Sequence, residues 1–579
     1  MMHEPGIPDH LTPLIMAKPQ LEDGRWRSDQ HEDGYRGGGG ARDEISSVFH
    51  EACGLNDQFR ASLSVIAELG FGSGLSILET IRLFREVSSS TARLCLVSCE
   101  QFPMDASAAK AMLSHDGAAP DLVSELIDQW PMAIGGWHRL SFLGGRVHLT
   151  LGLGDAAHLL PTLDFEADAW FLDGFSPAKN PEMWTPELLR LVTERSAPDA
   201  KLGTWCSAGE MRRTLSSLGW CVERISGFSN KRHRVQAHRT GAGHDRSAPQ
   251  KVKISGAGFA GAGAARAFAE RGWSVQIYDP NGPASAASGN PRSLVQPRLA
   301  KGVDAASHLH LHAALFAARQ MDQLGLQTTS GALHLPVGHH AAKVSTALGH
   351  QGLPEEFLQT LSASEASNIL GFPVGAGAWF PSARTVSGPE YVSAMLDHPN
   401  IELSQKVAPD STPDGTPMVW CTGSSAGSGL SIPGIHQIRG QLEILEPIPQ
   451  VNHAICFGHY LLPAHDAMVL GASYDHDDND SSVRENTAEA SLMVARSALP
   501  NLPLRRLGGR TSFRLASRDR LPLVGVDSSA THWMSLAHGS RGASTGPFLG
   551  AYLADLMEGV PTLLPTAYCR RLQPSRFIP

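Results

Sequence analysis

Asp173 has the sequence context of a side chain that accepts a proton from a substrate. It follows the apolar stretch 169–172 and opens a loop, Gly-Phe-Ser-Pro-Ala-Lys-Asn-Pro, that ends at Pro181. Ligands of open α/β sheets bind at the carboxyl ends of the strands, which predicts a binding site around Asp173. A carboxylate there can orient an amine substrate and take its proton. Such a group is needed where an amine receives a methyl group from a sulfonium donor, because only the neutral amine is a nucleophile. An aspartate that merely caps the following turn fits the same context.

The loop after Asp173 carries two further side chains with a chemical use. Phe175 can stack on a nucleic-acid base, and Lys179 can meet a phosphate. The combination favours a substrate site over a plain turn.

Two glycine-rich segments, residues 68–74 and 254–261, predict two nucleotide sites. Each follows a short β-branched apolar run and precedes a helical pattern, so each predicts a strand, a tight turn and a helix N-terminus. Backbone N–H groups in such a turn can approach a nucleotide where a β-carbon would block it. The glycines concerned are Gly70, Gly72, Gly74, Gly256, Gly258 and Gly261.

Acidic residues distinguish the two cofactors. Asp279 ends the predicted strand 275–279, 23 residues after Gly256, close to the spacing of an acid that binds ribose in a dinucleotide fold. This fits FAD or NAD. Glu100 ends the predicted strand 94–100, 30 residues after Gly70, in a loop that lacks the GxGxxG spacing. That loop suits S-adenosylmethionine, which has a ribose but no pyrophosphate.

Asp155 is a further candidate for the first cofactor site. It follows the predicted strand 147–151 and can accept a hydrogen bond from an adenine amino group. A Gly-Asp pair is also a routine turn, so both interpretations stay open.

Length and composition describe a multidomain globular protein. A chain of 579 residues with 42% hydrophobic and 18% charged residues predicts two or three domains. No run of 18 apolar residues and no basic, then apolar, leader is present, so we expect a cytoplasmic protein that does not bind membranes. Eight cysteines without a CxxC pair predict free, mostly buried thiols and no metal site.

Charge is uneven along the chain. The formal net charge of −9 argues against a generic nucleic-acid coat. Two basic clusters nevertheless occur, and each is either a solvated face or a contact for a polyanion. The clusters comprise Arg505, Arg506, Arg510, Arg514, Arg518 and Arg520, and Arg212, Arg213, Arg224, Lys231, Arg232 and Arg234.

Strands and helices alternate over residues 63–233, as in a doubly wound sheet. Residues 236–250 carry no apolar periodicity and predict a linker, with a domain boundary near residue 245. The second half opens with a βαβ unit at 252–279. Near its end, a glycine-rich loop at 538–547 leads into a predicted helix at 548–557.

These motifs together resemble the MnmC family of bifunctional tRNA 5-methylaminomethyl-2-thiouridine biosynthesis proteins. The resemblance runs from about residue 28 to residue 577, and the string 170–181 joined to an amine-oxidase half is its most specific feature. The other segments that carry it are residues 68–74, 208–209, 212–213, 227–228, 231–232, 287–290, 471–474 and 539–542.

The resemblance implies an α/β fold with two domains. Residues 1–245 would form a Rossmann-like methyltransferase domain that uses S-adenosylmethionine. Residues 246–579 would form a FAD-binding oxidoreductase domain of Rossmann type, α+β and similar to glycine and D-amino-acid oxidases.

The implied reaction modifies the wobble uridine at tRNA position 34. The FAD half would oxidise the C–N bond of a carboxymethylaminomethyl group, and hydrolysis of the imine would leave an aminomethyl base. The other half would then methylate that primary amine. The implied partner is tRNA, and neither DNA nor a membrane.

The resemblance also implies roles for individual residues. Gly70, Gly72, Gly74 and Glu100 would hold the methyl donor, with Asp155 near its adenine and Asp173 near the acceptor nitrogen. Phe175, Lys179, Lys231 and Arg232 would contact tRNA. On the FAD side, the expected contacts are Gly256, Gly258, Gly261 and Asp279 for the dinucleotide, Ser288, Gly289 and Asn290 beside the isoalloxazine, and Gly539, Ser540, Arg541 and Gly542 closing the site. Arg514 is the expected clamp for the substrate carboxylate, with Arg439 and Arg541 behind it.

Two other functions compete with this one. One is a small-molecule amine oxidase of the glycine or sarcosine type fused to a degenerate methyltransferase domain, and the other is a noncatalytic tRNA-binding protein. The intact string around Asp173 argues against lost transfer chemistry. Residues 31–43, with their glycine run, depart from the family pattern, so the family's N-terminal contacts are not expected there. Two departures are milder. The family commonly has Thr at the position of Ser73, and related flavoproteins often have Glu at the position of Asp279.

Overall fold

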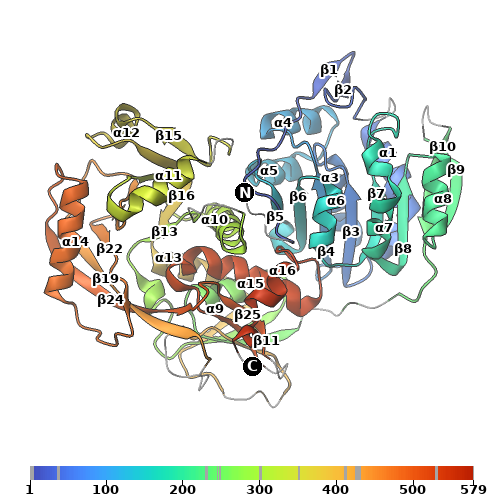
Figure 1. Cartoon of the computed structure of the whole chain (residues 1–579). Helices are drawn as coiled ribbons and strands as arrows, with labels where there is room; N and C mark the ends of the chain where they lie inside the picture. The colour runs from blue at the N-terminus through green and yellow to red at the C-terminus, as the bar shows by residue number, and fades with distance from the viewer. Residues whose placement is uncertain are drawn as a thin grey trace. The chain divides into compact units, whose positions relative to one another are not determined.

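The computed structural model of the chain describes residues 6–35, 40–228, 232–243, 246, 250–298, 303–349, 353–409, 412, 414–423, 432–527 and 532–577 (Figure 1). Two compact units form. The N-terminal unit comprises Pro8–Pro249 and Glu558–Thr566, and the C-terminal unit comprises Met1–Ile7, Gln250–Met557 and Ala567–Pro579. The predicted boundary residue, Asp245, lies outside the described residues. The limits of the two functional domains stay a prediction.

The N-terminal unit is built on a sheet with strand order β5-β6-β4-β3-β7-β8-β10-β9. Its central strands β6, β4, β3, β7 and β8 are parallel, while β5, β10 and β9 pair antiparallel to their neighbours. The strands are β3 (Leu63–Leu69), β4 (Arg93–Glu100), β5 (Gly136–Phe142), β6 (Val147–Leu153), β7 (Ala167–Leu172), β8 (Ser196–Thr204), β9 (Cys221–Ser226) and β10 (His233–His238).

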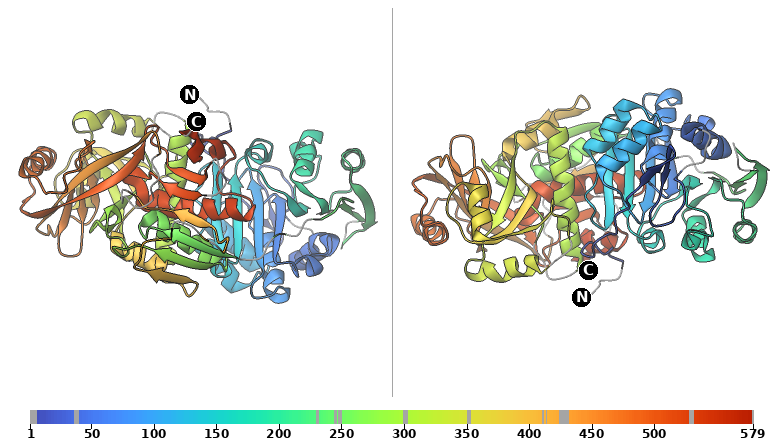
Figure 2. Two further views of the ribbon diagram at one scale, coloured as in Figure 1. Left: turned by 90° about the horizontal axis from the view of Figure 1, so that it is seen from below. Right: turned by 90° about the horizontal axis from the view of Figure 1, so that it is seen from above.

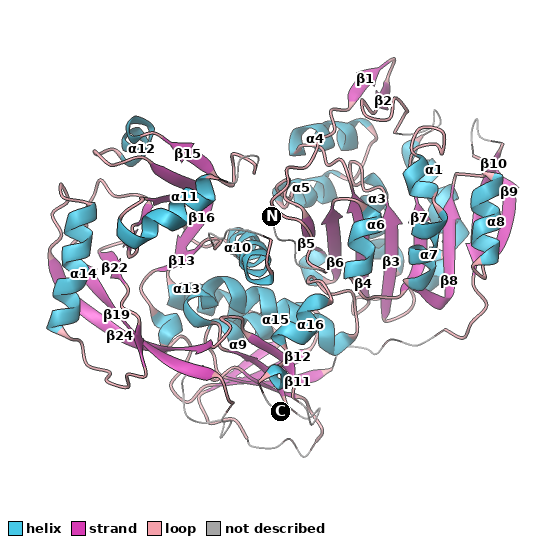
Figure 3. Ribbon diagram, viewed as in Figure 1, coloured by secondary structure: helices cyan, strands magenta, loops and turns pink. Residues whose placement is uncertain are grey.

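Helices cover both faces of this sheet (Figure 3). On β3, Ile66 packs into one apolar core together with α3, whereas Val65 and Ala67 pack into a second core together with α7. Both faces of the strand are therefore buried, which explains its nearly continuous apolar sequence. The helices of this unit are α1 (Ala41–Ile45), α2 (Leu55–Gln58), α3 (Leu75–Val87), α4 (Ala106–His115), α5 (Pro120–Asp128), α6 (Ala156–Leu159), α7 (Pro186–Glu194) and α8 (Gly209–Ser217), and β1 (Gln20–Glu22) and β2 (Arg25–Arg27) form a separate hairpin.

The C-terminal unit contains two sheets. The first, β17-β12-β11-β18-β26-β25, is parallel except for β25. The second has the path β13-β16-β14-β20-β21-β22-β19-β23, with β15 on β16 and β24 on β19. The first comprises β11 (Lys251–Ser255), β12 (Ser274–Tyr278), β17 (Ile401–Ser404), β18 (Met418–Trp420), β25 (Leu523–Val526) and β26 (Trp533–Leu536). The second comprises β13 (Ser293–Val295), β14 (Thr329–His334), β15 (Gln359–Leu361), β16 (Gly377–Val386), β19 (Ile435–Leu445), β20 (Ala454–Cys456), β21 (Tyr460–Pro463), β22 (Met468–Gly471), β23 (Asp475–His476) and β24 (Arg506–Ser517).

Helices of the C-terminal unit flank these sheets, as two further views show (Figure 2). They are α9 (Phe259–Glu270), α10 (Ala305–Gln323), α11 (Ala341–Leu348), α12 (Ala363–Leu370), α13 (Gly388–Leu396), α14 (Glu485–Ala498), α15 (Gly542–Glu558) and α16 (Ala567–Leu572). Over the residues that the structure describes, helices are too short or too polar to cross a membrane.

The late helix was predicted to begin at Phe548, and this was wrong, because α15 begins at Gly542. Its glycines serve close packing rather than a turn. A β-carbon on Gly546 would lie 2.7 Å from Phe259 O, and one on Gly550 would lie 2.5 Å from Ala264 N, both on α9. Tertiary packing of α9 against α15 therefore outweighs the low helix propensity of glycine.

Candidate active sites

The first glycine loop joins β3 to α3 and touches the segment that carries Asp173. Gly70 has φ +94°, and a β-carbon there would lie 2.1 Å from the main-chain oxygen of Asp173. The Asp173 N–H donates to Leu69 O at 3.1 Å. Because β7 ends at Leu172 beside β3, the loop and Asp173 emerge at the same sheet edge.

Glu100 closes the other side of this loop. It ends β4, and its Oε2 accepts the Gly72 N–H at 2.7 Å while Oε1 accepts the Phe102 N–H at 2.9 Å. Burial raises the pKa of Glu100 above its ordinary value of 4.5, and the backbone N–H donors oppose that shift. The carboxylate is thus fixed on the loop, as an acid that binds a ribose must be.

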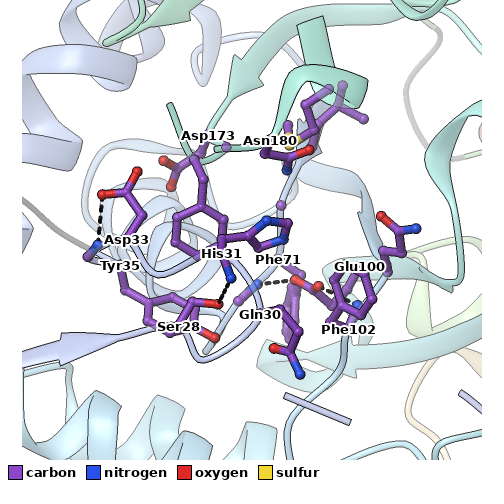
Figure 4. A pocket seen from close by; sticks show the side chains of 18 of the residues that line it. Ser28, Gln30, His31, Asp33, Tyr35, Phe71, Glu100, Phe102, Asp173 and Asn180 are labelled. Atoms are coloured by element: carbon purple, nitrogen blue, oxygen red, sulfur yellow. Dashed lines mark hydrogen bonds between the residues drawn. The ribbon is translucent and has the colours of Figure 1, made fainter. Parts of the chain in front are cut away.

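A cavity of about 730 Å³ lies at this edge of the sheet. Glu100 and Asp173 both line it (Figure 4). Asp155, Gly70 and Gly72 line it as well. Asp155 also caps α6, since its Oδ1 accepts the Ala157 N–H at 2.7 Å. Its position is thus compatible both with a local structural role and with contact to a ligand in the cavity. Gly74 instead lies at the N-cap of α3 and outside the cavity lining.

Phe175 is packed in an aromatic cluster that sequence reasoning did not foresee. Its ring centroid lies 4.6 Å from that of His31 and 5.4 Å from that of Tyr35. Tyr35 also faces the first glycine loop, residues 70–74, which we call the donor loop. A β-carbon on Gly72 in this loop would lie 3.9 Å from the Tyr35 ring. Burial and nearby Glu100 raise the pKa of Tyr35 above its ordinary value, so it is a neutral phenol. Tyr35 therefore contacts both the donor loop and the loop that follows Asp173, residues 174–181.

The N-terminal segment 28–35 is tied to the loop that follows Asp173. Asp33 Oδ2 accepts hydrogen bonds from Ser176 N at 3.2 Å and Ser176 Oγ at 3.0 Å, and His31 Nδ1 lies 3.4 Å from Lys179 O. Whether the family's N-terminal contacts carry over to residues 31–43 stays open, but residues 31–35 do contact the loop after Asp173 in this chain. Residues 31–35 form turns and bends rather than a strand, so no periodicity of the sequence could have indicated these contacts.

Of the predicted tRNA contacts, Phe175 lines the cavity, whereas Lys179 and Arg232 lie outside its lining. Lys179 is exposed, with Nζ 3.4 Å from Glu32 Oε2. Arg232 is exposed in the β9–β10 hairpin, where its main-chain oxygen accepts the Gly227 N–H at 3.0 Å. Lys231 lies outside the described residues. The roles of these three residues stay predictions.

The second glycine loop repeats the geometry of the first. It joins β11 to α9, and a β-carbon on Gly256 would lie 2.5 Å from Cys421 O. Asp279 follows β12, and its Oδ2 accepts the Ala257 N–H at 2.9 Å, as Glu100 accepts the Gly72 N–H. An acid at the end of the next strand thus fixes each loop.

A cavity of about 330 Å³ lies beside this loop. The predicted FAD contacts that line it are Gly256, Gly258, Asp279, Ser288, Asn290, Gly539, Ser540, Arg541 and Gly542. Gly261 and Gly289 lie outside the lining and serve packing, because β-carbons there would lie 1.7 Å from Gly256 O and 2.1 Å from Ala284 O.

The segment around Ser288 is held in place by groups from α9 and β24. Ser288 Oγ accepts the Phe259 N–H at 3.0 Å at the start of α9. Arg510 Nη2 donates to Ala286 O at 2.6 Å, and Arg510 Nη1 donates to Asn290 Oδ1. Arg510 was predicted only as one member of a basic cluster.

Arg514 lies on β24 with its guanidinium at the cavity. Its Nη1 donates to Ser540 Oγ at 2.8 Å and its Nη2 donates to Ser473 O at 2.9 Å. Its Cζ lies 5.3 Å from the ring centroid of Tyr474. Its buried Nε has no hydrogen-bond partner among the described residues. Burial lowers the pKa of Arg514 from its ordinary value of 12.5. A desolvated guanidinium with an unused donor suits a carboxylate.

Arg439, the second candidate for the carboxylate clamp, is placed differently. It is fully buried away from the cavity lining, where Nη1 donates to Asp475 at 3.0 Å and Nε to Asp480 O at 2.7 Å. The structure does not support it as a clamp. Arg506 is likewise used internally, in ion pairs with Glu443 and Glu485. The cluster 505–520 is therefore not one solvated basic face.

Other candidate chemistry is limited in the described parts of the chain. Six cysteines are buried, Cys569 is partly buried and Cys221 is exposed, all as free thiols, which agrees with the sequence prediction. The described residues contain no cluster of three or more His, Cys, Asp or Glu side chains that suits a metal ion.

The fold and the two sites define a protein class that comparison with known families supports. The family of S-adenosyl-L-methionine-dependent methyltransferases matches residues 118–240, and the family of FAD dependent oxidoreductases matches residues 251–556. The chain therefore joins a methyltransferase domain to a FAD-dependent oxidoreductase domain.

Full-length relatives make the assignment more specific. They are named tRNA 5-methylaminomethyl-2-thiouridine biosynthesis bifunctional protein MnmC. The Chromobacterium violaceum protein is 31% identical over 96% of both chains, and that of Marinobacter nauticus is 33% identical over 98% of both chains. The Thiobacillus denitrificans protein is 30% identical over 98% of this chain and 99% of its own. The present chain belongs to the MnmC family.

The two cofactors of such a protein, S-adenosylmethionine and FAD, fit the residues at the two sites. Each glycine loop presents backbone N–H groups at a helix N-terminus and an acid that can accept from ribose hydroxyls. Only the second loop has the dinucleotide spacing for a pyrophosphate.

Proposed function

We propose that this chain acts on the wobble uridine at tRNA position 34 in two steps. The first removes the carboxymethyl group from 5-carboxymethylaminomethyl-2-thiouridine, and the second methylates the resulting 5-aminomethyl group. The observation that supports this most is the pairing of Asp173 with the donor loop in one unit and of Arg514 with the FAD cavity in the other. One supplies a proton acceptor for an amine, and the other supplies a cation for a carboxylate.

In the first step, Arg514 binds and orients the substrate carboxylate. A bound FAD would supply the acceptor for the hydride that leaves the carbon next to the amine. The C–N bond becomes an imine, and water cleaves it to the primary amine and a 2-oxo acid. Little acid–base help is needed because the amine reacts in its neutral form, so orientation of the carbon and exclusion of water are the main contributions of the protein.

In the second step, the primary amine attacks the methyl group of S-adenosylmethionine. Asp173 orients the amine and takes the proton that its nitrogen loses as the new C–N bond forms. Tyr35 and Phe175 form an aromatic pair that lines the cavity beside Gly72, and a base can stack on such a pair. Glu100 and Asp155 hold the ribose and adenine ends of the donor.

The alternative, a small-molecule amine oxidase with a degenerate methyltransferase domain, receives less support. A degenerate site would have no need to keep an acid on the donor loop, an aspartate beside that loop and an open cavity of about 730 Å³ between them.

The test is mass spectrometry of wobble nucleosides. Purified enzyme is incubated with tRNA from a strain that lacks this activity, with and without S-adenosylmethionine. We expect the aminomethyl nucleoside without the methyl donor and the methylaminomethyl nucleoside with it. Oxidation of free glycine or sarcosine in place of tRNA would instead support the alternative.

A further inference from the structure

Gln296 lines the cavity of the C-terminal unit and is held from several directions. It follows β13, and its main-chain oxygen accepts a hydrogen bond from Arg541 Nη1 at 2.9 Å. Its side-chain Oε1 lies 2.7 Å from His334 Nε2 and 4.0 Å from Cys456 Sγ. These contacts fix both the main chain and the side chain of a residue at the cavity wall.

A second buried histidine orients the first. His334, at the end of β14, is 3% exposed, and its Nδ1 lies 3.1 Å from Nε2 of His340, which is 8% exposed. The two rings are stacked, with centroids 5.3 Å apart. Burial, with His340 and Arg541 nearby, lowers the pKa of His334 to about 3. His334 is therefore neutral and has one N–H donor and one acceptor.

His340, His334, Gln296 and Cys456 form a series of hydrogen-bonded side chains, and the donor of each bond can be assigned from the chemistry of these groups. Burial raises the pKa of Cys456 to about 12, so its thiol keeps its proton and donates toward Gln296. Since the atom of Gln296 that faces both groups is its amide oxygen, which only accepts, His334 Nε2 is assigned as a donor. His334 accepts at Nδ1, and His340 supplies that proton. The amide nitrogen of Gln296, which has two N–H donors, is then available to donate to a ligand in the cavity.

We propose that Gln296 donates a hydrogen bond to the isoalloxazine ring of FAD and that His334 and His340 position it. The inference rests on the FAD domain and not on the identity of the amine substrate. The same cavity is lined by the dinucleotide loop and by residues 539–542. A planar ring with carbonyl oxygens and imino nitrogens provides the acceptors that a fixed donor recognises. Reduction adds electron density to that ring, so the donor favours the reduced flavin.

The direct test replaces Gln296 by leucine, which is of similar size and has no donor. Apoprotein of each variant is titrated with FAD by flavin fluorescence, and the midpoint potential of the bound flavin is measured. For Gln296→Leu we expect an about tenfold higher dissociation constant, the size of one lost hydrogen bond. We also expect a more negative midpoint potential.

Variants of His334 test the positioning role. His334→Gln keeps a side-chain N–H that can reach Gln296, whereas His334→Leu does not. We expect His334→Leu to shift FAD affinity and potential in the same direction as Gln296→Leu, and His334→Gln to restore most of both. His308→Gln is the matched control, because His308 is 1% exposed, bonds Tyr568 at 3.1 Å and lies outside the cavity lining.

Several outcomes would overturn the proposal. Unchanged FAD affinity and potential in Gln296→Leu would remove Gln296 as a flavin donor. A change confined to the KM for tRNA would assign the donor to the uracil ring of the substrate instead. An equal loss in His334→Gln and His334→Leu would refute positioning by His334. Thermal unfolding of each apoprotein separates these effects from a folding defect, and Gln296→Leu still tests the donor if His334→Leu does not fold.

Discussion

The role proposed for Asp173 depends on where β7 ends. The strand stops at Leu172, so the next side chain stands at the sheet edge and lines the cavity, while its main chain contacts Gly70 of the donor loop. The proposed proton acceptor and the loop proposed to hold the methyl donor thus follow adjacent strands, β7 and β3. At the scale of single residues, the proposed chemistry can be tested one side chain at a time.

Asp173→Asn should lower the rate of methyl transfer at least about 100-fold, because the amide cannot take the proton. Flavin reduction by substrate should stay unchanged, since Asp173 belongs to the N-terminal unit. Single-turnover methylation and anaerobic flavin absorbance measure the two. The control is Asp164→Asn, whose side chain is 81% exposed. Equal loss of both activities in Asp173→Asn would contradict the division of labour.

Glu100 should make binding of S-adenosylmethionine depend on pH. Burial raises the pKa of Glu100. Its ionised form accepts hydrogen bonds from ribose hydroxyls and its protonated form loses an acceptor, so affinity should fall as pH drops through the raised pKa. Calorimetric titrations at a series of decreasing pH values measure this dependence. Glu100→Gln should bind weakly with a flat profile, whereas Glu86→Gln, at a side chain 52% exposed, should keep the wild-type slope. A sloping profile in Glu100→Gln would assign the titration to another group.

Arg514→Ala should raise the KM for the carboxymethylated tRNA about tenfold or more, because a hydrogen-bonded charge pair contributes about 1.5 to 3 kcal/mol. Methylation of aminomethyl tRNA should be unaffected, since that substrate has no carboxylate. Steady-state kinetics with both tRNAs measure the contrast. Arg505→Ala, on the same segment but 74% exposed, serves as the control. Equal effects on the two substrates would remove Arg514 as the clamp.

At the scale of elements, the close contact of α9 and α15 joins the two ends of the FAD site. The N-terminus of α9 follows the dinucleotide loop, and α15 begins at Gly542, directly after the residues that line the other side of the cavity. The small residues between these helices therefore set the distance across the site.

Gly550→Ala should destabilise the protein by about 1 to 3 kcal/mol, because its β-carbon would lie 2.5 Å from Ala264 N and overpack the helix pair. We expect a lower Tm and weaker retention of FAD. Gly508→Ala is the matched control, since a β-carbon there meets no atom within 4 Å. Differential scanning calorimetry with and without FAD measures both, and an unchanged Tm in Gly550→Ala would show that the helices can separate at no cost.

At the scale of the whole molecule, the N-terminal unit is discontinuous in sequence. Residues 558–566 belong to it, and Val560 lies in its apolar core. Glu558 forms an ion pair with buried Arg93, and Pro561 O accepts from Arg139 Nη2 at 3.0 Å. The methyl-transfer half thus depends on residues that lie beyond the entire FAD-binding segment of the chain.

A fragment of residues 1–249 should therefore unfold at a lower temperature than the same fragment with 558–566 attached through a flexible linker. Without that segment Arg93 is a buried cation that lacks its carboxylate, which is costly. A linked segment with Glu558→Gln should restore only part of the difference. Equal Tm values for all three fragments would show that the segment does not stabilise this unit.

The sequence alone determined the two nucleotide loops, their acids and Asp173. These features are local, because a strand, a glycine turn and a helix start follow one another in the chain, and the acid ends the next strand. For the same reason β4 ends at Glu100, as predicted for the strand 94–100.

Tertiary structure alone decided the remaining features. The aromatic contact of Tyr35 with Phe175, the burial of Arg439 away from the cavity and the helical start at Gly542 all depend on packing between distant segments. The link from His340 through His334 to Gln296 depends on it as well. No periodicity records such contacts, since each arises from elements that meet only when the sheets and helices have packed.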